Sequence, residues 1–339
     1  MTATRTHLLR VLFCLALLCL AAPAVRAANA PRVEAFADLP IHAHSALLMD
    51  FATGKVLFEK NPDQPIPPAS LTKLMTLHVA YKEIKAGRLR KSDRVHIPPQ
   101  AYASRMPRPS SLMLLGPNQV VTVGELMLGL AVASGNDAAV ALACHIAGSV
   151  GNFAARMNLE ARNLGYTTMR FVDPSGLSPE NTVTAREFAD FCRRYIMMHP
   201  ESLAELHSKR EFLYPKPQNV LRAGKRHARI KSKLHHSRNI LLGQYEGVDG
   251  LKPGYIRLSG NNLALTARRG DKRLVAVVLG EEVLRGGIGR RNLRNDCTLL
   301  LDYGFGGVAA VAGRLGEREN RHIEEPAGAP RPSYLFGGP

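Results

Sequence analysis

The order of strand-like and helix-like segments is the feature that most limits the folds open to this chain. Two short apolar runs, 44–51 and 55–59, flank Ala52-Thr53-Gly54 and predict a hairpin near the start. Further strand-like runs follow a long helical stretch, at 211–214, 250–258, 262–268 and 274–279. Because strands open and close the chain, we predict an α+β domain with an antiparallel sheet formed from both chain ends and a helical middle.

Apolar residues at helical spacing fill the middle of the sequence. One helix is predicted to begin near Ser70, because Pro67 and Pro68 cannot continue a preceding helix but are tolerated where one begins. Thr184 and Glu187 predict another helix start, with Glu187 placed to complete a capping box. The remaining predicted helices are 123–133, 138–147, 152–164 and 292–301.

The N-terminus has the pattern of a secretory signal peptide. Arg5 and Arg10 precede an uncharged run over 11–25, and small residues follow it. A retained membrane anchor is the competing interpretation, although this run is short for a spanning helix. We expect residues 1–30 to be removed and the remainder to be soluble outside the cytoplasm, ending in a disordered Gly/Pro-rich tail over 311–339.

Charge narrows the range of partners. The formal net charge is +17, and loss of residues 1–30 would remove three arginines and no acid, so the remainder stays strongly basic. A basic protein outside the cytoplasm is attracted to anionic lipid headgroups or cell-wall polymers, and nucleic acid is not expected as a partner there. The densest basic run, 222–238, is the segment expected to contact such a membrane or wall surface, with a solvated loop as the alternative.

Metal and cofactor sites are not predicted. The three cysteines beyond the leader, Cys144, Cys192 and Cys297, lie in apolar helical segments without ligand spacing, which is typical of buried thiols. The adjacent His235 and His236 have no carboxylate or cysteine at the spacing of a zinc site. We therefore expect neither a metal nor a cofactor.

Ser70 and Lys73 are the first candidates for chemistry. Residues three apart share a helix face with Cβ atoms roughly 5–6 Å apart, so the Lys73 amine can reach the Ser70 oxygen. A nucleophile would then stand beside a base. Lysine acts as a base at neutral pH only if burial or a second cation lowers its pKa from about 10.4, so a second cation is required elsewhere in the chain. The S-x-x-K pair alone also occurs by chance on exposed helices.

Two more short motifs follow at wide intervals, Ser134-Gly135-Asn136 and Lys252-Pro253-Gly254. Taken alone, each is typical of an ordinary turn. Together with Ser70-Leu71-Thr72-Lys73, they resemble the S-x-x-K, S-x-N and K-[ST]-G set of the penicillin-binding proteins and serine β-lactamases. The three motifs together are specific for these proteins, whereas each motif alone is not.

The resemblance covers roughly residues 40–305 and is to the low-molecular-mass D-alanyl-D-alanine carboxypeptidases. The further segments that match this family are 47–54, 110–113, 173–177, 248–251 and 302–305. The resemblance implies a β-lactamase/DD-peptidase-like catalytic domain over 31–310, secreted across the inner membrane into the periplasm. Peptidoglycan stem peptides are the implied substrates, and β-lactam antibiotics are the implied acylating inhibitors.

The same resemblance implies a role for each motif residue. Ser70 would attack the carbonyl of the penultimate D-alanine to form an acyl-enzyme, and Lys73 would accept its proton. Ser134 would relay the proton to the departing D-alanine. Asn136 would bind the substrate amide or hold Lys73. Lys252 would attract the terminal carboxylate and supply the cation that lowers the Lys73 pKa.

This chain departs from the family at Pro253 and Ile256, where Thr or Ser and a second Thr are usual. Pro253 lacks the hydroxyl that would contact the substrate carboxylate, although proline is tolerated at a sheet edge. The neighbouring Gly254 is retained and is assigned to substrate binding. Three arginines are candidates for the substrate carboxylate, and their spacing does not choose among them: Arg290, Arg291 and Arg294.

The implied activity is removal of the terminal D-alanine from peptidoglycan pentapeptides. An endopeptidase that cuts peptide cross-links would use the same residues. A class A β-lactamase is disfavoured, because no E-x-x-L-N stretch lies between Ser134 and Lys252. Pro253 also leaves open a penicillin- or muropeptide-binding protein that keeps the fold with weakened catalysis.

Overall fold

The computed structural model describes residues 39–220, 232–282 and 288–324. The chain divides into Met1–Phe36 and Ala37–Pro339, and every described residue belongs to the second unit. The predicted signal peptide, most of the basic run 222–238 and the end of the predicted tail therefore lie outside the described residues.

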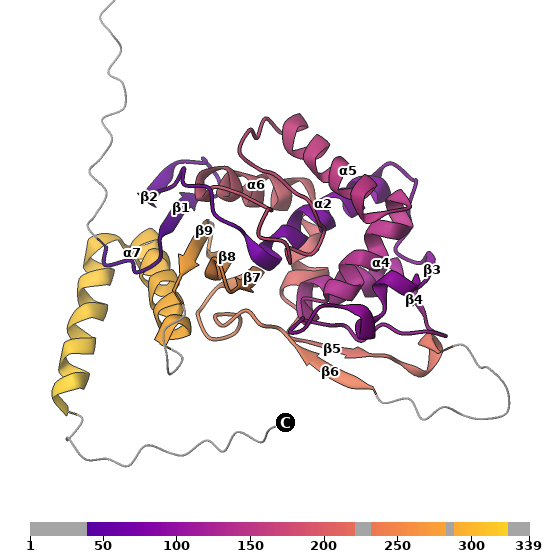
Figure 1. The fold of residues 1–339 in the computed structure, drawn as a ribbon. Coiled ribbons are helices and arrows are strands. Elements are labelled where there is room, and N and C mark those ends of the chain that lie inside the picture. Colours follow the sequence, from indigo (N-terminus) through magenta and orange to yellow (C-terminus); the bar gives the residue numbers. More distant parts are fainter. Residues whose placement is uncertain (1–38, 221–231, 283–287, 325–339) are drawn as a thin grey trace, which may run out of the picture. The chain divides into compact units, whose positions relative to one another are not determined.

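A five-stranded antiparallel sheet organises this unit, in the order β2-β1-β9-β8-β7 (Figure 1). Its strands are β1 (Ser45–Asp50), β2 (Val56–Lys60), β7 (Val248–Ile256), β8 (Gly260–Arg269) and β9 (Lys272–Glu281). β1 and β2 form the predicted hairpin, and β1 also pairs with β9 in continuous register. The prediction of an antiparallel sheet made from both chain ends is confirmed.

The predicted helical middle is also present. Its helices are α2 (Lys73–Lys85), α3 (Val123–Leu128), α4 (Asn136–Ala147), α5 (Val150–Asn163) and α6 (Ala185–Met198). Shorter turns occupy Ala69–Thr72 (η1), Pro99–Ala101, Ala103–Arg105, Gly129–Ala133, Leu203–His207 and Pro217–Asn219. Two small ribbons pair β3 (Arg94–His96) with β4 (Val120–Thr122) and β5 (Glu211–Tyr214) with β6 (Lys233–His236). The predicted helix 123–133 is α3 continued by a π-helical turn.

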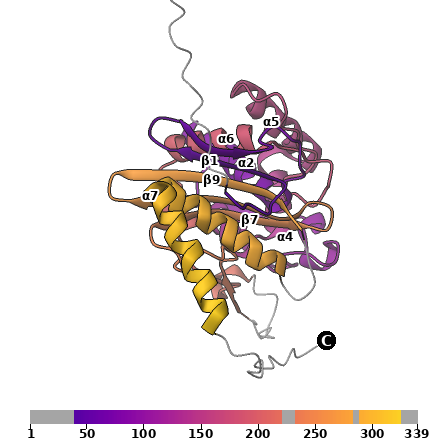
Figure 2. The same ribbon diagram turned by 90° about the vertical axis from the view of Figure 1, so that its left-hand side faces the viewer.

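Helices cover both faces of the sheet. Figure 2 shows the last helix, α7 (Ile288–Glu324), in front of the strands, with α2 and α6 behind them. Both α6 and α7 pack on the central strand β9. Every residue over 274–281 is consequently buried, and this stretch lacks the polar alternation of a strand with one solvated face.

Helix α7 differs from its prediction. It extends beyond 292–301 at both ends and continues past residue 310, so the predicted disordered tail is helical as far as Glu324. Gly307, with φ of 66°, interrupts the helical geometry, and the chain then resumes it. Gly304 allows close packing on the sheet, because a Cβ there would lie 2.4 Å from Leu274 Cδ1. Glycine at this position thus serves helix–sheet contact and does not end the helix.

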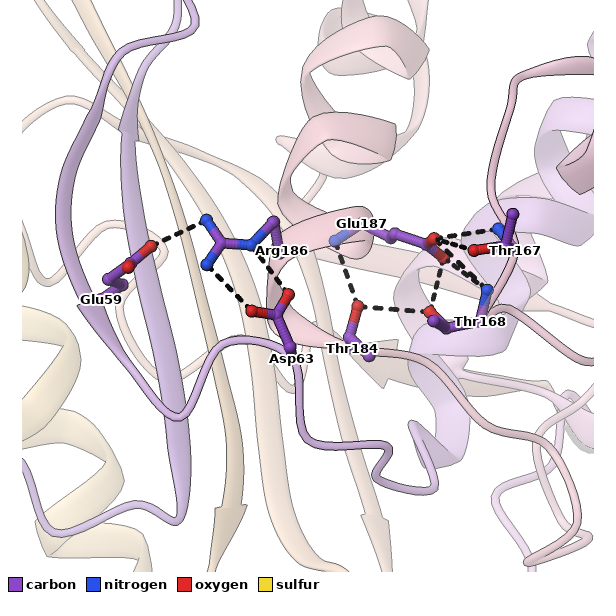
Figure 3. A network of polar contacts seen from close by, with 7 residues as sticks. All are labelled: Glu59, Asp63, Thr167, Thr168, Thr184, Arg186 and Glu187. Carbon is purple, nitrogen blue, oxygen red and sulfur yellow. Dashed lines mark hydrogen bonds and ion pairs between the residues drawn. The ribbon is translucent and has the colours of Figure 1, made fainter. Parts of the chain in front are cut away.

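Helix α6 begins after Thr184 as predicted, but without a capping box. Thr184 Oγ1 accepts a hydrogen bond from the Glu187 backbone N–H at 3.3 Å. The Glu187 carboxylate does not turn back to Thr184; it accepts hydrogen bonds from Thr167 and Thr168 (Figure 3). Glu187 therefore ties the segment after α5 to the start of α6.

The cysteines largely follow the prediction of buried thiols. Cys192 and Cys297 are buried, whereas Cys144 near the end of α4 is partly exposed and lies 3.4 Å from Gln100 Nε2. All three are free thiols.

Among the helices of the described ranges, none alone is long and apolar enough to cross a membrane. The helices α4 and α5 meet both criteria only when taken together, as a pair bent by 83°.

Candidate active site

Ser70 and Lys73 meet where a tight turn becomes a helix. Ser70 lies in η1, and Lys73 is the first residue of α2. Ala69, just before the serine, has φ of 50°, an uncommon left-handed conformation for a residue with a Cβ. The Lys73 amine lies 2.9 Å from Ser70 Oγ, and the lysine side chain is fully buried.

Two further oxygens surround the Lys73 amine. Asn136 Oδ1 accepts a hydrogen bond at 2.7 Å, and the Ser175 backbone carbonyl accepts one at 2.6 Å. The Asn136 amide nitrogen is directed to Ser110 Oγ at 3.3 Å, which supports this orientation of its side chain. A neutral amine has two N–H groups and one lone pair. With both N–H groups directed to these two acceptors, the lone pair is left for the Ser70 hydroxyl.

Ser134 and Asn136 stand on a reversal of the chain between the π-helical turn and α4. Ser134 has φ of 57°, and Asn136 begins α4. Gly135 allows the close approach of a neighbouring segment, because a Cβ there would lie 3.0 Å from the Met113 backbone nitrogen. The buried Asp137 carboxylate accepts the Met113 N–H at 2.8 Å and fixes that segment against α4.

Lys252 and Gly254 lie on β7, an edge strand of the sheet. The buried Lys252 amine donates a hydrogen bond to Ser134 Oγ at 2.9 Å. A Cβ on Gly254 would lie 2.8 Å from the Pro68 carbonyl and 3.0 Å from the Ser70 backbone nitrogen. Glycine therefore allows β7 to lie directly against η1. All six residues predicted for the site are brought together by these contacts.

A cavity of about 700 Å³ opens above these residues. Ser70, Ser134, Asn136 and Gly254 line it, whereas the two lysines are buried beneath its surface. Its wall also includes apolar groups, which are Leu177, Ile240, Ile256, Leu263 and Leu293. A substrate in this cavity would contact the two serine hydroxyls directly. It would be linked to the lysine amines only through the hydrogen bonds that these amines form with the serines.

Burial is the main cause of the altered lysine pKa values. It lowers the pKa of Lys73 from 10.5 to about 7; Asp173 and Asp137 act to raise this pKa, and Arg238 lowers it. The pKa of Lys252 is lowered well below its ordinary value, first by burial and then by Lys73 and Arg238. The prediction allowed burial or a second cation to lower the Lys73 pKa, and named Lys252 as that cation. The structure assigns the larger effect to removal of the amine from water.

Among the described residues, two arginines line the cavity. Arg290, at the start of α7, is the one member of the predicted trio that does so. Arg238, after β6, also lines it, and sequence analysis placed this residue only in the basic run 222–238. No motif marks Arg238, because its closeness to the site follows from the path of the chain into β7.

Pro253 and Ile256, the two departures from the family pattern, both line the cavity. Pro253 pairs in register with Leu263 on the inner side of β7, while no strand of the described ranges pairs with the other side. Pro253 therefore lies on an edge strand, where proline is tolerated. The Pro253 carbonyl accepts a hydrogen bond from the Lys252 amine at 3.2 Å.

Comparison with known proteins decides the family. Residues 29–283 match the model of the D-alanyl-D-alanine carboxypeptidase family of peptidases. The chain belongs to this family. It is 38% identical over 269 residues to the D-alanyl-D-alanine carboxypeptidase DacC of Escherichia coli, an alignment that covers 78% of this chain and 62% of DacC. The chain thus spans about three fifths of the length of this curated relative.

Solved structures show the same fold. Penicillin-binding protein 5 of Haemophilus influenzae superposes with a TM-score of 0.69 at 33% identity, covering 79% of this chain and 72% of that protein. Penicillin-binding protein D2 of Listeria monocytogenes, in an ampicillin-bound form, gives a TM-score of 0.65 at 25% identity and covers 79% and 99% of the two chains.

Proposed function

We propose that this protein is a serine-type D-Ala-D-Ala carboxypeptidase that removes the terminal D-alanine from peptidoglycan pentapeptides. The observation that carries the proposal is the environment of the Lys73 amine. Its two fixed acceptors leave the lone pair for Ser70 Oγ, and its pKa of about 7 keeps a large share of it neutral near pH 7. A surface Ser-x-x-Lys pair would have neither property.

In the proposed reaction, Ser70 Oγ attacks the carbonyl carbon of the penultimate D-alanine while its proton passes to Lys73. Collapse of the tetrahedral intermediate breaks the C–N bond, and the proton held by Lys73 passes through the Ser134 hydroxyl to the leaving amine of D-alanine, which leaves Lys73 neutral again. The Lys252–Ser134 hydrogen bond of 2.9 Å supports this route. Water then cleaves the acyl-enzyme ester, releasing the shortened peptide and returning the proton to Ser70.

Substrate binding is proposed for Asn136, Lys252 and Gly254. Asn136 lines the cavity and also holds Lys73, so the two roles left open by the sequence are compatible in one side chain. Arg290 is the proposed partner of the terminal carboxylate, because it lines the cavity and its charge suits a carboxylate ligand. Pro253 has no hydroxyl to donate a hydrogen bond to the terminal carboxylate, so binding of this carboxylate depends more on Arg290.

The experiment measures D-alanine release from a diacyl-Lys-D-Ala-D-Ala peptide and covalent labelling by a fluorescent penicillin. We expect wild type to release D-alanine and to label, and Ser70→Ala to do neither. Ser208→Ala is the matched control, since that hydroxyl donates to the Leu203 carbonyl outside this cavity. Release that survives in Ser70→Ala would rule out the serine mechanism.

The same assay separates the alternatives. Labelling without D-alanine release would favour a binding protein weakened by Pro253. Cleavage of a cross-linked muropeptide at a higher kcat/KM than that of the pentapeptide would favour an endopeptidase. β-Lactam acylation is proposed from the same cavity and from the ampicillin-bound relative in Listeria monocytogenes.

We further propose that 31–310 is the catalytic domain of a chain exported to the periplasm after loss of 1–30, and that the basic run 222–238 contacts an anionic membrane or wall surface. In the described part of this run, the β5–β6 ribbon carries Lys233 beside the cross-strand pair Leu213 and Leu234, whose leucines are each 44% exposed. Sedimentation with anionic vesicles but not with neutral vesicles is the expected result. Equal sedimentation with both would exclude the electrostatic contact.

A further inference from the structure

The loop over 173–178 forms one side of the site and is built around a single carboxylate. Asp173 Oδ1 accepts the backbone N–H groups of Ser175 at 2.7 Å and Gly176 at 2.8 Å, and also the Ser175 hydroxyl at 2.6 Å. Asp173 Oδ2 accepts the Ser178 N–H at 2.9 Å and the Asn181 amide at 3.0 Å. These contacts close the loop on its own first residue.

This loop contacts the site at three points. The Ser175 carbonyl accepts the Lys73 hydrogen bond, and the Pro174 carbonyl accepts one from Thr76 Oγ1 at 2.7 Å, one turn further along α2. Gly176 lies so close to η1 that a Cβ would fall 1.8 Å from the Ala69 carbonyl. Gly176 also lines the cavity, as does its neighbour Leu177.

The charge of Asp173 acts on the same lysine. Burial alone would raise the pKa of Asp173, but its hydrogen bonds from Ser175, Ser178 and Gly176 outweigh burial and lower the pKa, so the group is a carboxylate at neutral pH. Of the charged groups that act on Lys73, Asp173 is the strongest that opposes the effect of burial. The other charged groups around the amine are Asp137 at the start of α4, Arg238 after β6 and Lys252 on β7.

We infer, on the basis of the proposed serine mechanism, that Asp173 is a positioning residue for the general base: its carboxylate holds the loop whose Ser175 carbonyl orients the Lys73 amine, and it places a negative charge near that amine. Asp173 does not line the cavity and takes no part in bond making. Its two effects oppose each other, because the ordered loop aims the lone pair at Ser70 while the charge makes the lysine hold its proton to a higher pH.

Asp173→Asn removes the negative charge and replaces one carboxylate oxygen with an NH2 group. If this group takes the place of Oδ2, it cannot accept the hydrogen bonds from Ser178 and Asn181. Loss of the negative charge lowers the pKa of Lys73, so the acid limb of the acylation rate against pH moves to lower pH. We expect a shift of about one pH unit, at the lower end of what a neighbouring opposite charge produces. We also expect the acylation rate at high pH, where Lys73 is neutral, to fall by roughly tenfold or more, because the Lys73 amine is no longer held in the orientation that faces Ser70.

Glu187→Gln is the matched control. Glu187 is also a carboxylate that accepts N–H and hydroxyl hydrogen bonds from a neighbouring segment (Figure 3). It does not line the cavity. This variant makes the same carboxylate-to-amide change and is expected to lose stability while keeping the wild-type pH profile. A purely structural role for Asp173 predicts that both variants behave alike.

The readout is the rate of acylation by a fluorescent penicillin across the neutral pH range, with thermal unfolding measured in parallel. If wild type itself fails to label, the serine mechanism fails. If wild type labels and Asp173→Asn keeps the wild-type acid limb, or shifts it no more than Glu187→Gln does, the inference about Asp173 is wrong. Should Asp173→Asn not fold, Asp173→Ser replaces it, because a short hydroxyl can still accept from the loop amides without a charge.

Discussion

The Lys252 amine donates a hydrogen bond to the Ser134 hydroxyl at 2.9 Å, across 118 positions of sequence. Lys73 and Ser70 form a second lysine–serine pair of the same length, and these two residues are only three positions apart. The site is therefore a duplicated arrangement in which each buried amine faces a hydroxyl at the cavity. Because Lys73 disfavours the charged form of Lys252, the two amines do not readily carry protons together.

The rate of acylation is expected to depend on pH through Lys73. Only the neutral amine can accept the Ser70 proton, and the Lys73 pKa is about 7. The rate should thus increase about tenfold per pH unit below pH 7 and level off above it. Lys73→Arg retains a cation that does not deprotonate, and it should show no acylation at any of these pH values. A wild-type rate that stays constant through pH 7 would contradict this assignment.

Arg290→Ala should weaken substrate binding without preventing reaction with Ser70. Loss of a charged hydrogen bond to the terminal carboxylate costs about 1.5–3 kcal/mol, so KM should increase roughly 10- to 100-fold while kcat changes less. Arg291→Ala is the control, since Arg291 neighbours Arg290 on α7 and does not line the cavity. Steady-state kinetics on the tripeptide would decide between them, and equal effects would argue for general electrostatic attraction.

Pro253→Thr should improve turnover by restoring a hydroxyl at the cavity wall. One added hydrogen bond of about 1 kcal/mol corresponds to an increase of roughly fivefold in kcat/KM. Stability should change little, because β7 is an edge strand and threonine suits extended backbone. D-alanine release measured beside thermal unfolding tests both parts. An unchanged kcat/KM would show that the proline departure has no effect on catalysis.

Gly176→Ala should disrupt the site through packing. Gly176 has φ of 80°, and an added Cβ would lie 1.8 Å from the Ala69 carbonyl, next to Ser70. The backbone must shift, at a cost of at least about 1 kcal/mol of unfolding free energy. Labelling by penicillin should fall together with stability. Gly151→Ala in α5 is the comparison, because a Cβ there meets nothing within 4 Å. Similar losses in both variants would exclude a local effect at Ser70.

Local patterns predicted the five strands of the main sheet, β5 and most helices, but not β3, β4 or β6. The full set of six motif residues came from the resemblance to a known family. Periodicity located β9 correctly, since its apolar run is buried on both faces. The same reasoning ended the last helix at 301, whereas α7 continues through Gly304, which packs closely on Leu274. It also misjudged Glu187, whose carboxylate binds Thr167 and Thr168. A glycine in close packing and a glycine that ends a helix look identical in one sequence.

The site shows the same limit. Spacing alone predicted that Lys73 reaches Ser70, because both lie on consecutive helical turns. Arg238 was missed because only the path of the chain between β6 and β7 brings it to the cavity. The segment 173–177 was singled out for its match to the family, yet the direction of the Ser175 carbonyl toward Lys73 depends on backbone angles that no residue type specifies. Burial of the lysines likewise follows from tertiary packing.

The position of β9 between β1 and β8 also governs when the sheet can assemble during synthesis of the chain. β1 and β2 are made first, but the strand that joins them to β8 and β7 is made only after about two hundred further residues have been added. Contacts of such long sequence separation form slowly, and until they form the edge of β1 that pairs with β9 has no strand beside it. A chain ending before Lys272 would contain Ser70, Lys73, Ser134 and Lys252, and would still lack the strand that joins β1 to β8.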